Sequence, residues 1–468
     1  MRQFFADRRA LYVGGAVLVL LVIGGVAFTR ALPAPQPTVV AEPMAVPSAA
    51  LLDSVAADTV PAGLGRPASI LTGDAAFAFD AIGDGVPRVA KPDAVKGLYL
   101  NAWAAGSSRK LARLIDIADR TEINTFVIDV KEGGQISYRS RVPLAREIGA
   151  DQNYISDVRR VLQQLRAHGI YPIARIVVFR DETLANARPD WAVRHVAGGD
   201  WVDADGHAWV DSFNRHVWDY NIAIAREALE LGFSEIQWDY VRFPDVPQAL
   251  MRTAAWPAQA GRSKADAIRE FLLYSREQLK PYDAPVTADV FGLTVSARTD
   301  MGIGQLWEKM ADATAVLLPM VYPSHFARGS YGIAQPNASP RETVLRAMQY
   351  AVRRNSAIDG AAAIRPWLQD FTLGQPRYTA AHVRAQIDAV YDAGLTEWVL
   401  WHAGSNYTVA ALATSDGVVP KFPAASDTAA LDTVRQDTVK VDTARVDTVR
   451  IDTAVIMLPK PDTLTSRP

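Results

Sequence analysis

The sequence predicts an α/β fold, a (β/α)8 TIM barrel, within residues 94–425. Eight apolar runs of strand length alternate there with amphipathic segments of helix length, which is typical of a closed barrel. Three of the helical segments end at a glycine just before the next strand, at Gly169, Gly232 and Gly394. No glycine-rich phosphate loop follows the first strand, which counts against an open dinucleotide-binding sheet.

Each predicted strand is an apolar run bounded by turn or helix signals. In chain order the runs are GLYLNAW from Gly97, NTFVIDV from Asn124, YPIARIVVF from Tyr171, EIQWDYV from Glu235, PVTADVF from Pro285, AVLLPMVY from Ala315, AAIRPWLQ from Ala362 and EWVLWHA from Glu397.

Helical periodicity fills the gaps between these runs. The predicted helices are Ser108 to Arg120, Tyr154 to His168, Val217 to Leu231, Lys264 to Lys280, Arg341 to Arg353 and Ala380 to Ala393.

A long insertion separates the third and fourth strands. It contains the stretch GGDWVDADGHAWVDSF, in which Asp205 and Gly206 stand between two alternating runs and predict a β-hairpin turn. Trp201 and Trp209 flank this turn. They form either an aromatic flap over the barrel mouth or the packing that holds the hairpin down, and the sequence does not favour one over the other.

The N-terminus predicts a membrane segment. Arg2, Arg8 and Arg9 precede an uncharged apolar run at residues 11–28, which would span roughly 27 Å as a helix. The length favours an uncleaved, single-pass anchor within residues 1–30 over a cleaved signal peptide, which would make the protein secreted. In both cases the positive flank stays cytoplasmic and the rest is exported. Residues 31–93, rich in Ala, Pro, Val and Gly, are predicted to be a linker.

The C-terminal tail, residues 426–468, is a low-complexity extension. Residues 427–456 read DTAAL DTVRQ DTVKV DTARV DTVRI DTAVI. A period of five matches neither a helix nor a strand, so no continuous apolar face forms. The unit lacks the glycines and ligand density of calcium-binding repeats, which makes a calcium site a weak alternative.

Composition limits the classes of function. Hydrophobic residues make up 49% of the chain, enough for a sizeable core, and 49 Lys and Arg nearly balance 51 Asp and Glu. Nucleic acid is therefore not the expected partner. With no cysteine, the chain has no disulfide, thiolate metal site or cysteine nucleophile. His402 has no partner at metal-ligand spacing, so no metal site or other cofactor is expected.

Two aspartates stand where a barrel would place its chemistry, at the C-terminal ends of strands. In EIQWDYV, alternation puts Gln237 and Asp239 on one face, and in PVTADVF it puts Thr287 and Asp289 on one face of the following strand. Two acids in unlike environments can protonate a leaving oxygen and stabilise or attack an oxocarbenium-like carbon, as glycoside hydrolysis requires. Asp239 and Asp289 are thus the catalytic candidates, against the alternative that each caps a loop or pairs with a cation such as Arg242.

Other strand ends supply secondary candidates. Asp129, predicted to share a face with Lys131, is expected to form a structural salt bridge with Arg175 on the next strand. Glu132, just before a Gly-Gly bend, is a possible third acid. The substrate-binding candidates and the other polar strand ends are Arg242, Tyr322, Trp401, Trp103, Gln369, Asp370 and His402, with the two tryptophans as sugar-stacking platforms or core residues.

The block WVDSFNRHVWDYNIAIAREALELGFSEIQWDYVRFPD, from Trp209 to Asp245, extends this interpretation. Together with VKGLYLNAW, VIDVKEGG and ARIVVFRD it resembles a bacterial family of glycoside hydrolase domains, formerly a domain of unknown function. The resemblance covers most of residues 96–406 and implies a glycosidase-type barrel, often exported or membrane-tethered. It carries Asp239 over first as a functional position and Asp289 second.

Three functional hypotheses follow. The first is a hydrolase of an extracellular or cell-envelope polysaccharide that uses Asp239 and Asp289, in roles and with a stereochemistry that the sequence leaves open. The second is a non-catalytic envelope protein that binds carbohydrate on the same barrel. The third is a scaffold whose repeat tail binds a partner, and in that case the aspartates would be dispensable.

Overall fold

The computed structural model describes residue 77 and residues 85–422. The predicted membrane segment at 11–28, most of the predicted linker and the tail from residue 426 lie outside the described residues. Within the described part of the chain, no helix combines the length and the apolar character needed to cross a membrane.

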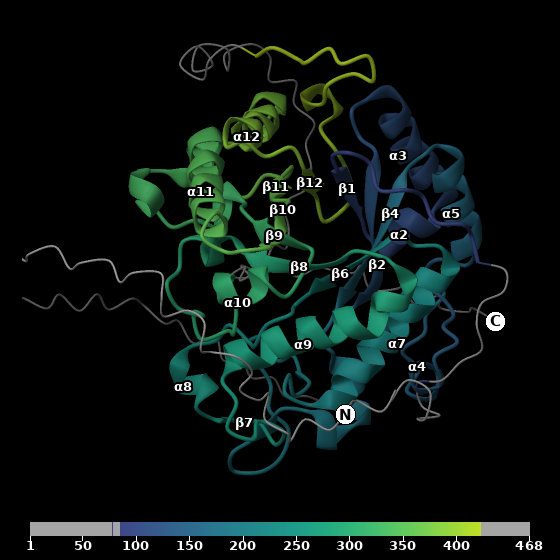
Figure 1. Cartoon of the computed structure of the whole chain (residues 1–468), viewed down its shortest axis with the longest axis vertical. Helices are drawn as coiled ribbons and strands as arrows, with labels where there is room; N and C mark the ends of the chain where they lie inside the picture. The colour runs from purple at the N-terminus through teal and green to yellow at the C-terminus, as the bar shows by residue number, and fades with distance from the viewer. Residues whose placement is uncertain (1–76, 78–84, 423–468) are drawn as a thin grey trace, which may run out of the picture. The chain divides into compact units, whose positions relative to one another are not determined.

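Parallel strands close into an eight-stranded barrel, in which β10 and β11 together make up one strand (Figure 1). The order around the barrel is β1, β12, β11, β9, β8, β6, β4 and β2, and β1 pairs with both β12 and β2 to complete the circle. The strands are β1 (Lys96–Leu100), β2 (Thr125–Glu132), β4 (Tyr171–Val177), β6 (Glu235–Asp239), β8 (Val286–Phe291), β9 (Val316–Met320), β10 with β11 (Ala363–Ile364 and Trp367–Gln369) and β12 (Trp398–Trp401). The predicted (β/α)8 barrel is confirmed.

The seventh strand was predicted as one continuous run, but in the structure it is divided into two short strands. Arg365 and Pro366 split it into β10, which pairs with β9, and β11, which pairs with β12. Proline has no N–H to donate to a ladder, which explains why regular pairing stops there.

Helices cover the outside of the barrel (Figure 1). The six predicted ones are α3 (Ser108–Arg120), α5 (Val158–Ala167), α7 (Arg215–Leu231), α9 (Lys264–Leu279), α11 (Pro340–Asn355) and α12 (Ala380–Asp392). Side-chain caps begin several of them, as where Ser107 accepts from the N–H of Lys110 and Asp157 from that of Arg160. Short helices that were not predicted are α2 (Ala102–Gly106), α4 (Pro143–Glu147), α6 (Glu182–Ala187), α8 (Gln248–Met251) and α10 (Trp307–Ala311).

Strand alternation divides the core into two clusters, one between strands and helices and one inside the barrel. In β6, Trp238 faces outward, where its ring lies 5.3 Å from that of Phe271 on α9 and its Nε1 donates to Ser275. Gln237, its neighbour, faces inward and is fully buried. The predicted two faces of this strand are confirmed.

The insertion between β4 and β6 is a compact, packed segment. Its strand β5 (Arg194–His195) pairs with β7 (Ala254–Ala255) from the segment that follows β6, and a single bridge joins Val202 to Ala208 across the predicted turn, in place of a longer hairpin. The rings of Trp201 and Trp209 are buried, and their indole N–H groups donate to Thr253 and Asp203. Neither ring is free to form a flap, so the packing interpretation is the correct one.

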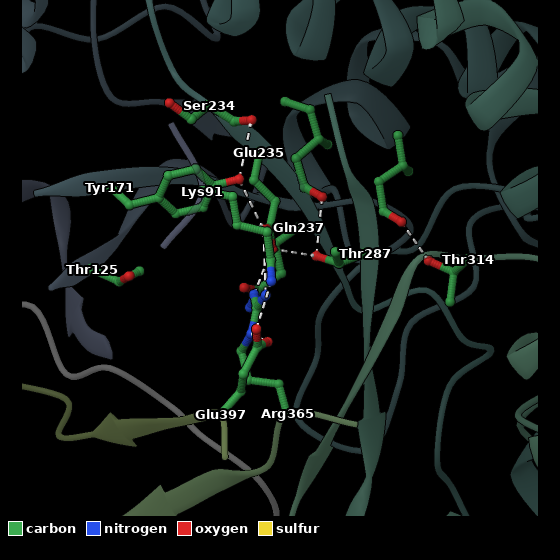
Figure 2. Close-up of polar contacts among 12 residues, drawn as sticks. Lys91, Thr125, Tyr171, Ser234, Glu235, Gln237, Thr287, Thr314, Arg365 and Glu397 are labelled. Atoms are coloured by element: carbon green, nitrogen blue, oxygen red, sulfur yellow. Dashed lines mark hydrogen bonds and ion pairs between the residues drawn. The ribbon is translucent and has the colours of Figure 1, made fainter. Parts of the chain in front are cut away.

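The amino ends of the strands form the barrel floor, which a buried ion network occupies (Figure 2). Arg365 lies between Glu235 and Glu397, with Nη1 2.6 Å from Glu235 Oε1 and Nε 2.8 Å from Glu397 Oε2. Tyr171 and Thr287 donate hydroxyl hydrogen bonds to Glu235, and Lys91 Nζ lies 2.6 Å from Glu397 Oε1. Two cations thus balance two carboxylates.

Residues 85–95 run beneath the barrel as a strap. Val86 N–H donates to the carbonyl of Leu231, and the Ser234 hydroxyl donates to the carbonyl of Val89. Gly232, which ends α7, has a φ of 121°, and a Cβ built on it would lie 2.4 Å from the oxygen of Val86. The close approach of the strap to the end of α7 therefore requires glycine at position 232.

We expect Gly232→Ala to destabilise the protein more than Gly394→Ala. Both glycines have a left-handed φ, which costs a side chain about 1–2 kcal/mol. At Gly394 a Cβ meets nothing within 4 Å, whereas at Gly232 it meets the strap. Urea unfolding of the two variants measures the difference, and equal losses would show that the strap contact contributes nothing.

Candidate active site

The barrel mouth is built from two layers of inward side chains, each supplied by alternate strands. The outer layer comes from β2, β6, β9 and β12: Asp129, Asp239, Met320 and Trp401. The layer beneath comes from β1, β4, β8 and β11: Tyr99, Arg175, Asp289 and Trp367.

Arg175 joins the carboxylates of the mouth. Its Nε and Nη2 lie 2.9 and 2.5 Å from Asp239 Oδ2, and its Nη1 donates to Glu132 Oε2 at 2.7 Å and also to Asp129. The guanidinium lies 5.7 Å from the centre of the Tyr99 ring. The predicted pair of Asp129 and Arg175 is confirmed, but the same cation also binds two further acids, which the sequence did not show.

Asp239 ends β6 at the rim, with 6% of its surface exposed. Its Oδ1 accepts from the backbone N–H of Tyr240 at 2.6 Å, and Tyr240 itself has a left-handed φ of 49°. A non-glycine residue in that region is uncommon and often marks a functional site. Both oxygens of Asp239 are therefore held in place.

Asp289 lies beside Asp239 and one layer deeper. Trp238 pairs with Ala288, so the next residues along β6 and β8 are Asp239 and Asp289, as predicted. Only 1% of Asp289 is exposed, and its Oδ1 accepts from Gln237 Nε2 at 2.9 Å and from Trp367 Nε1 at 2.7 Å. Burial, reinforced by the negative charge of Asp239, raises the pKa of the Asp289 carboxyl well above its usual range.

Asp129 is also buried, and Tyr99 donates its hydroxyl hydrogen to it at 2.5 Å. Burial raises the pKa of this carboxyl to about 7, with the Arg175 cation opposing that shift and negative charge on Glu132 adding to it. The mouth therefore holds a carboxyl group that exchanges its proton near neutral pH.

This raised pKa predicts a pH-dependent stability. The folded protein holds a proton on Asp129 that the unfolded chain releases above the ordinary pKa of 3.8, so the stability is full below that value and falls as the pH rises to about 7. The Asp129→Asn variant lacks this titration. We expect urea unfolding between pH 4 and 7 to show a steeper decline for the parent than for the variant, and parallel curves would contradict this.

A β-bulge in β2 corrects one prediction. The register with β4 shifts between Asp129 and Lys131, so that Lys131 points outward and does not share the face of Asp129. Its ammonium is fully buried and contacts Asp181, Asn221 and the carbonyl of Val177 at 2.6 to 2.8 Å. The sequence carried no signal for the bulge, because alternation was the only pattern available.

Aromatic rings line the side of the mouth next to β12. Trp401 lies 6.0 Å from Tyr99, 5.7 Å from Tyr322 and 5.2 Å from Phe371, measured between ring centres. Trp401 is partly exposed, whereas Tyr322 is buried. Trp401, a predicted platform, therefore presents an accessible ring beside the carboxylates.

The other predicted substrate-binding residues lie in different surroundings. Arg242 is buried among the rings of Trp209, Tyr240 and Phe291 and donates to the carbonyl of Phe243. Gln369 is buried and braces two loops by donating to the carbonyl of Phe371 and accepting from the N–H of Ser324. Asp370 accepts from the N–H and hydroxyl of Thr408.

Trp103 and His402 lie just after β1 and β12. Trp103, on α2, is 53% exposed and packs on Tyr154 at 4.5 Å. His402 accepts from the N–H of Gly404.

Neither the insertion nor the floor competes as the active site. In residues 77 and 85–422, Asp203, Asp205 and His207 bring one ligand atom each within 4.8 Å of the others. However, Asp203 Oδ1 already accepts two N–H groups of its own turn. A hollow of about 900 Å³ beside Lys91 and Tyr171 lies at the floor, whereas barrel enzymes act at the opposite end.

A family model described as "Putative glycosyl hydrolase domain" matches residues 97–407. A hypothetical protein from Ruminiclostridium thermocellum ATCC 27405 is 41% identical over 41% of this chain and 97% of its own, with a TM-score of 0.39. No curated protein matches the chain.

Two solved glycoside hydrolase domains are also similar. That of PgaB (BpsB) from Bordetella bronchiseptica is 15% identical over 67% of this chain and 95% of its own, with a TM-score of 0.49. That of PelA from Pseudomonas aeruginosa is 11% identical over 68% of this chain and 97% of its own, with a TM-score of 0.39.

Proposed function

The chain belongs to the family described as a putative glycosyl hydrolase domain, and we propose that its barrel hydrolyses glycosidic bonds of a polysaccharide at the mouth around Asp239. The observation that supports this most directly is the position of Asp239, at the C-terminal end of β6 and bound by two nitrogens of Arg175. A carboxylate so held faces the substrate side of the fold.

Glycoside hydrolysis requires an ionised carboxylate next to the anomeric carbon and a group that protonates the leaving oxygen. Arg175 and the N–H of Tyr240 stabilise the negative charge of Asp239 for the first role. Asp289 was the predicted partner. It lies one layer below Asp239 and is 1% exposed, and its raised pKa favours a carboxyl group that holds a proton beneath Asp239.

The aromatic side of the mouth suits a sugar substrate. A pyranose ring has an apolar face that stacks on an aromatic ring, and Trp401 presents one within the same layer as Asp239. An extended glycan would thus lie across the mouth with one sugar on Trp401. The apolar segment at residues 11–28 supports an exported, membrane-anchored protein, and hence an extracellular or cell-envelope polysaccharide as substrate.

A digestion screen tests this function. The full-length protein is incubated with a panel of bacterial and plant polysaccharides, and new reducing ends are counted. We expect new reducing ends to be released from at least one polymer. Retention on a polymer without cleavage would instead support the non-catalytic binding protein, and loss of function on deleting residues 426–468 alone would support the scaffold.

A further inference from the structure

Glu132 is the most exposed acid of the mouth. Its side chain is 32% exposed, against 8% for the side chain of Asp239 and 2% for that of Asp129. Asp289 is 1% exposed over the whole residue. Its Oε2 accepts from Arg175, and among the described residues no donor reaches its Oε1. One oxygen is therefore anchored and the other is free to meet a substrate.

The bulge in β2 places Glu132 at the barrel mouth. Regular alternation from Asp129 would bring Lys131 inward and turn Glu132 toward the helices. The extra residue reverses both, and bulges next to active sites commonly re-aim a side chain in this way. The position of Glu132 is thus a consequence of local backbone geometry.

Two contacts hold the bulge in this form. Lys131 is locked on the outer face by Asp181, whose carboxylate lies 2.6 Å from its ammonium. Beyond Glu132 the chain turns through Gly133 and Gly134, both with positive φ, into β3 (Gln135–Ile136). A Cβ on Gly134 would lie 2.3 Å from Asp181 Oδ1, so the turn packs directly on the same carboxylate.

Glu132 and Asp239 also share one cation. Glu132 accepts from Nη1 of Arg175 and Asp239 from Nη2, and these two nitrogens belong to one rigid, planar group. The shared guanidinium holds both carboxyl groups at the same rim. Asp289 contacts Gln237 and Trp367 in the layer beneath and lacks this placement.

We propose that Glu132, positioned by the bulge, is the residue that donates a proton to the glycosidic oxygen in the reaction of Asp239. This inference rests on the proposed hydrolase function. The Glu132 carboxyl gives its proton to the leaving oxygen as the bond from that oxygen to the anomeric carbon breaks. Asp239 stabilises the positive charge that develops on the carbon. Water supplies the new hydroxyl group, and its second proton returns to the carboxyl groups of the mouth.

The cluster can hold the proton that this step needs. Three carboxyl groups, those of Asp129, Glu132 and Asp239, contact one guanidinium, so at full ionisation the carboxylates in contact with Arg175 outnumber it by two. Asp129 and Glu132 both contact Nη1, so the carboxyl group of Asp129, whose pKa burial raises to about 7, lies next to Glu132.

The test compares two substrates. One is the polysaccharide that the parent cleaves in the screen, and the other is the 2,4-dinitrophenyl glycoside of the sugar released from it, whose leaving group departs without a proton. We expect Glu132→Gln to lower kcat/KM on the polysaccharide by about 10²–10⁴-fold and far less on the dinitrophenyl glycoside.

Two variants complete the design. Glu147→Gln changes a surface acid that likewise pairs with one arginine, Arg188, and should behave as the parent. Asp239→Asn should be inactive on both substrates. If Asp239→Asn is inactive while Glu132→Gln matches Glu147→Gln, or loses activity equally on both substrates, the inference is wrong and the hydrolase function stands. If the parent cleaves no polymer, both fail.

Discussion

Replacing Asp239 with asparagine is expected to lower the turnover of the polysaccharide found in the screen on the order of 10⁴-fold, in the range measured for removal of a central catalytic group. Asparagine keeps the size of the side chain but removes the negative charge that faces the anomeric carbon. Initial rates of reducing-end release measure the effect.

The fold should tolerate this change. Arg175 retains Asp129 and Glu132 as partners, so no buried cation is left without a counter-charge. Asp245→Asn is the matched control, since Asp245 is exposed in the same segment of chain. We expect both variants to unfold at the temperature of the parent within a few degrees. An Asp239→Asn protein that cleaves the polymer as fast as Asp245→Asn would disprove the assignment of Asp239.

Replacing Arg365 with leucine is expected to cost about 3–5 kcal/mol of unfolding free energy. The change leaves Glu235 without its cation and Glu397 with Lys91 alone (Figure 2). Glu235 and Arg365 are fully buried, so water cannot replace the missing charge. Urea unfolding near neutral pH measures the loss.

Two controls separate burial from charge. Arg346→Leu breaks an exposed helix pair with Glu342 and should cost less than about 1 kcal/mol. Adding Glu235→Gln to Arg365→Leu removes one unpaired charge and should restore part of the stability. The remaining folded molecules should keep their activity because the network lies at the opposite end of the barrel from Asp239. A loss of under 1 kcal/mol for Arg365→Leu would show that the network is dispensable.

Most of the fold followed from local patterns. Every barrel strand was predicted, because each is a separate apolar run, and the helices between them were predicted because their apolar residues recur on one face. The split of the seventh strand was missed although Pro366 was visible, since the surrounding apolar run outweighed a single proline. The short helices were missed because one turn is too brief for a periodicity.

The candidate site was predicted only in part. Alternation in β6 and β8 was regular, so the inward direction of Asp239 and Asp289 was correct and their adjacency followed from neighbouring strands. Alternation in β2 was broken by the bulge, so Lys131 was assigned to the wrong face. The burial of the Trp201 and Trp209 rings could not be predicted from residue patterns either, because it depends on how the insertion packs against the segment after β6, which supplies Thr253 as the partner of Trp201.

The sequence by itself determined the barrel, the end of the barrel at which the candidate site lies, and the two aspartates of β6 and β8. These features depend on periodicity and on the direction of parallel strands. The tertiary structure decided which acids meet. Arg175 gathers Asp129, Glu132 and Asp239 from two other strands, and the layering of the barrel puts Asp289 beneath them. Such choices depend on register, stagger and one inserted residue, and each of these is a property of strands packed together rather than of any strand alone.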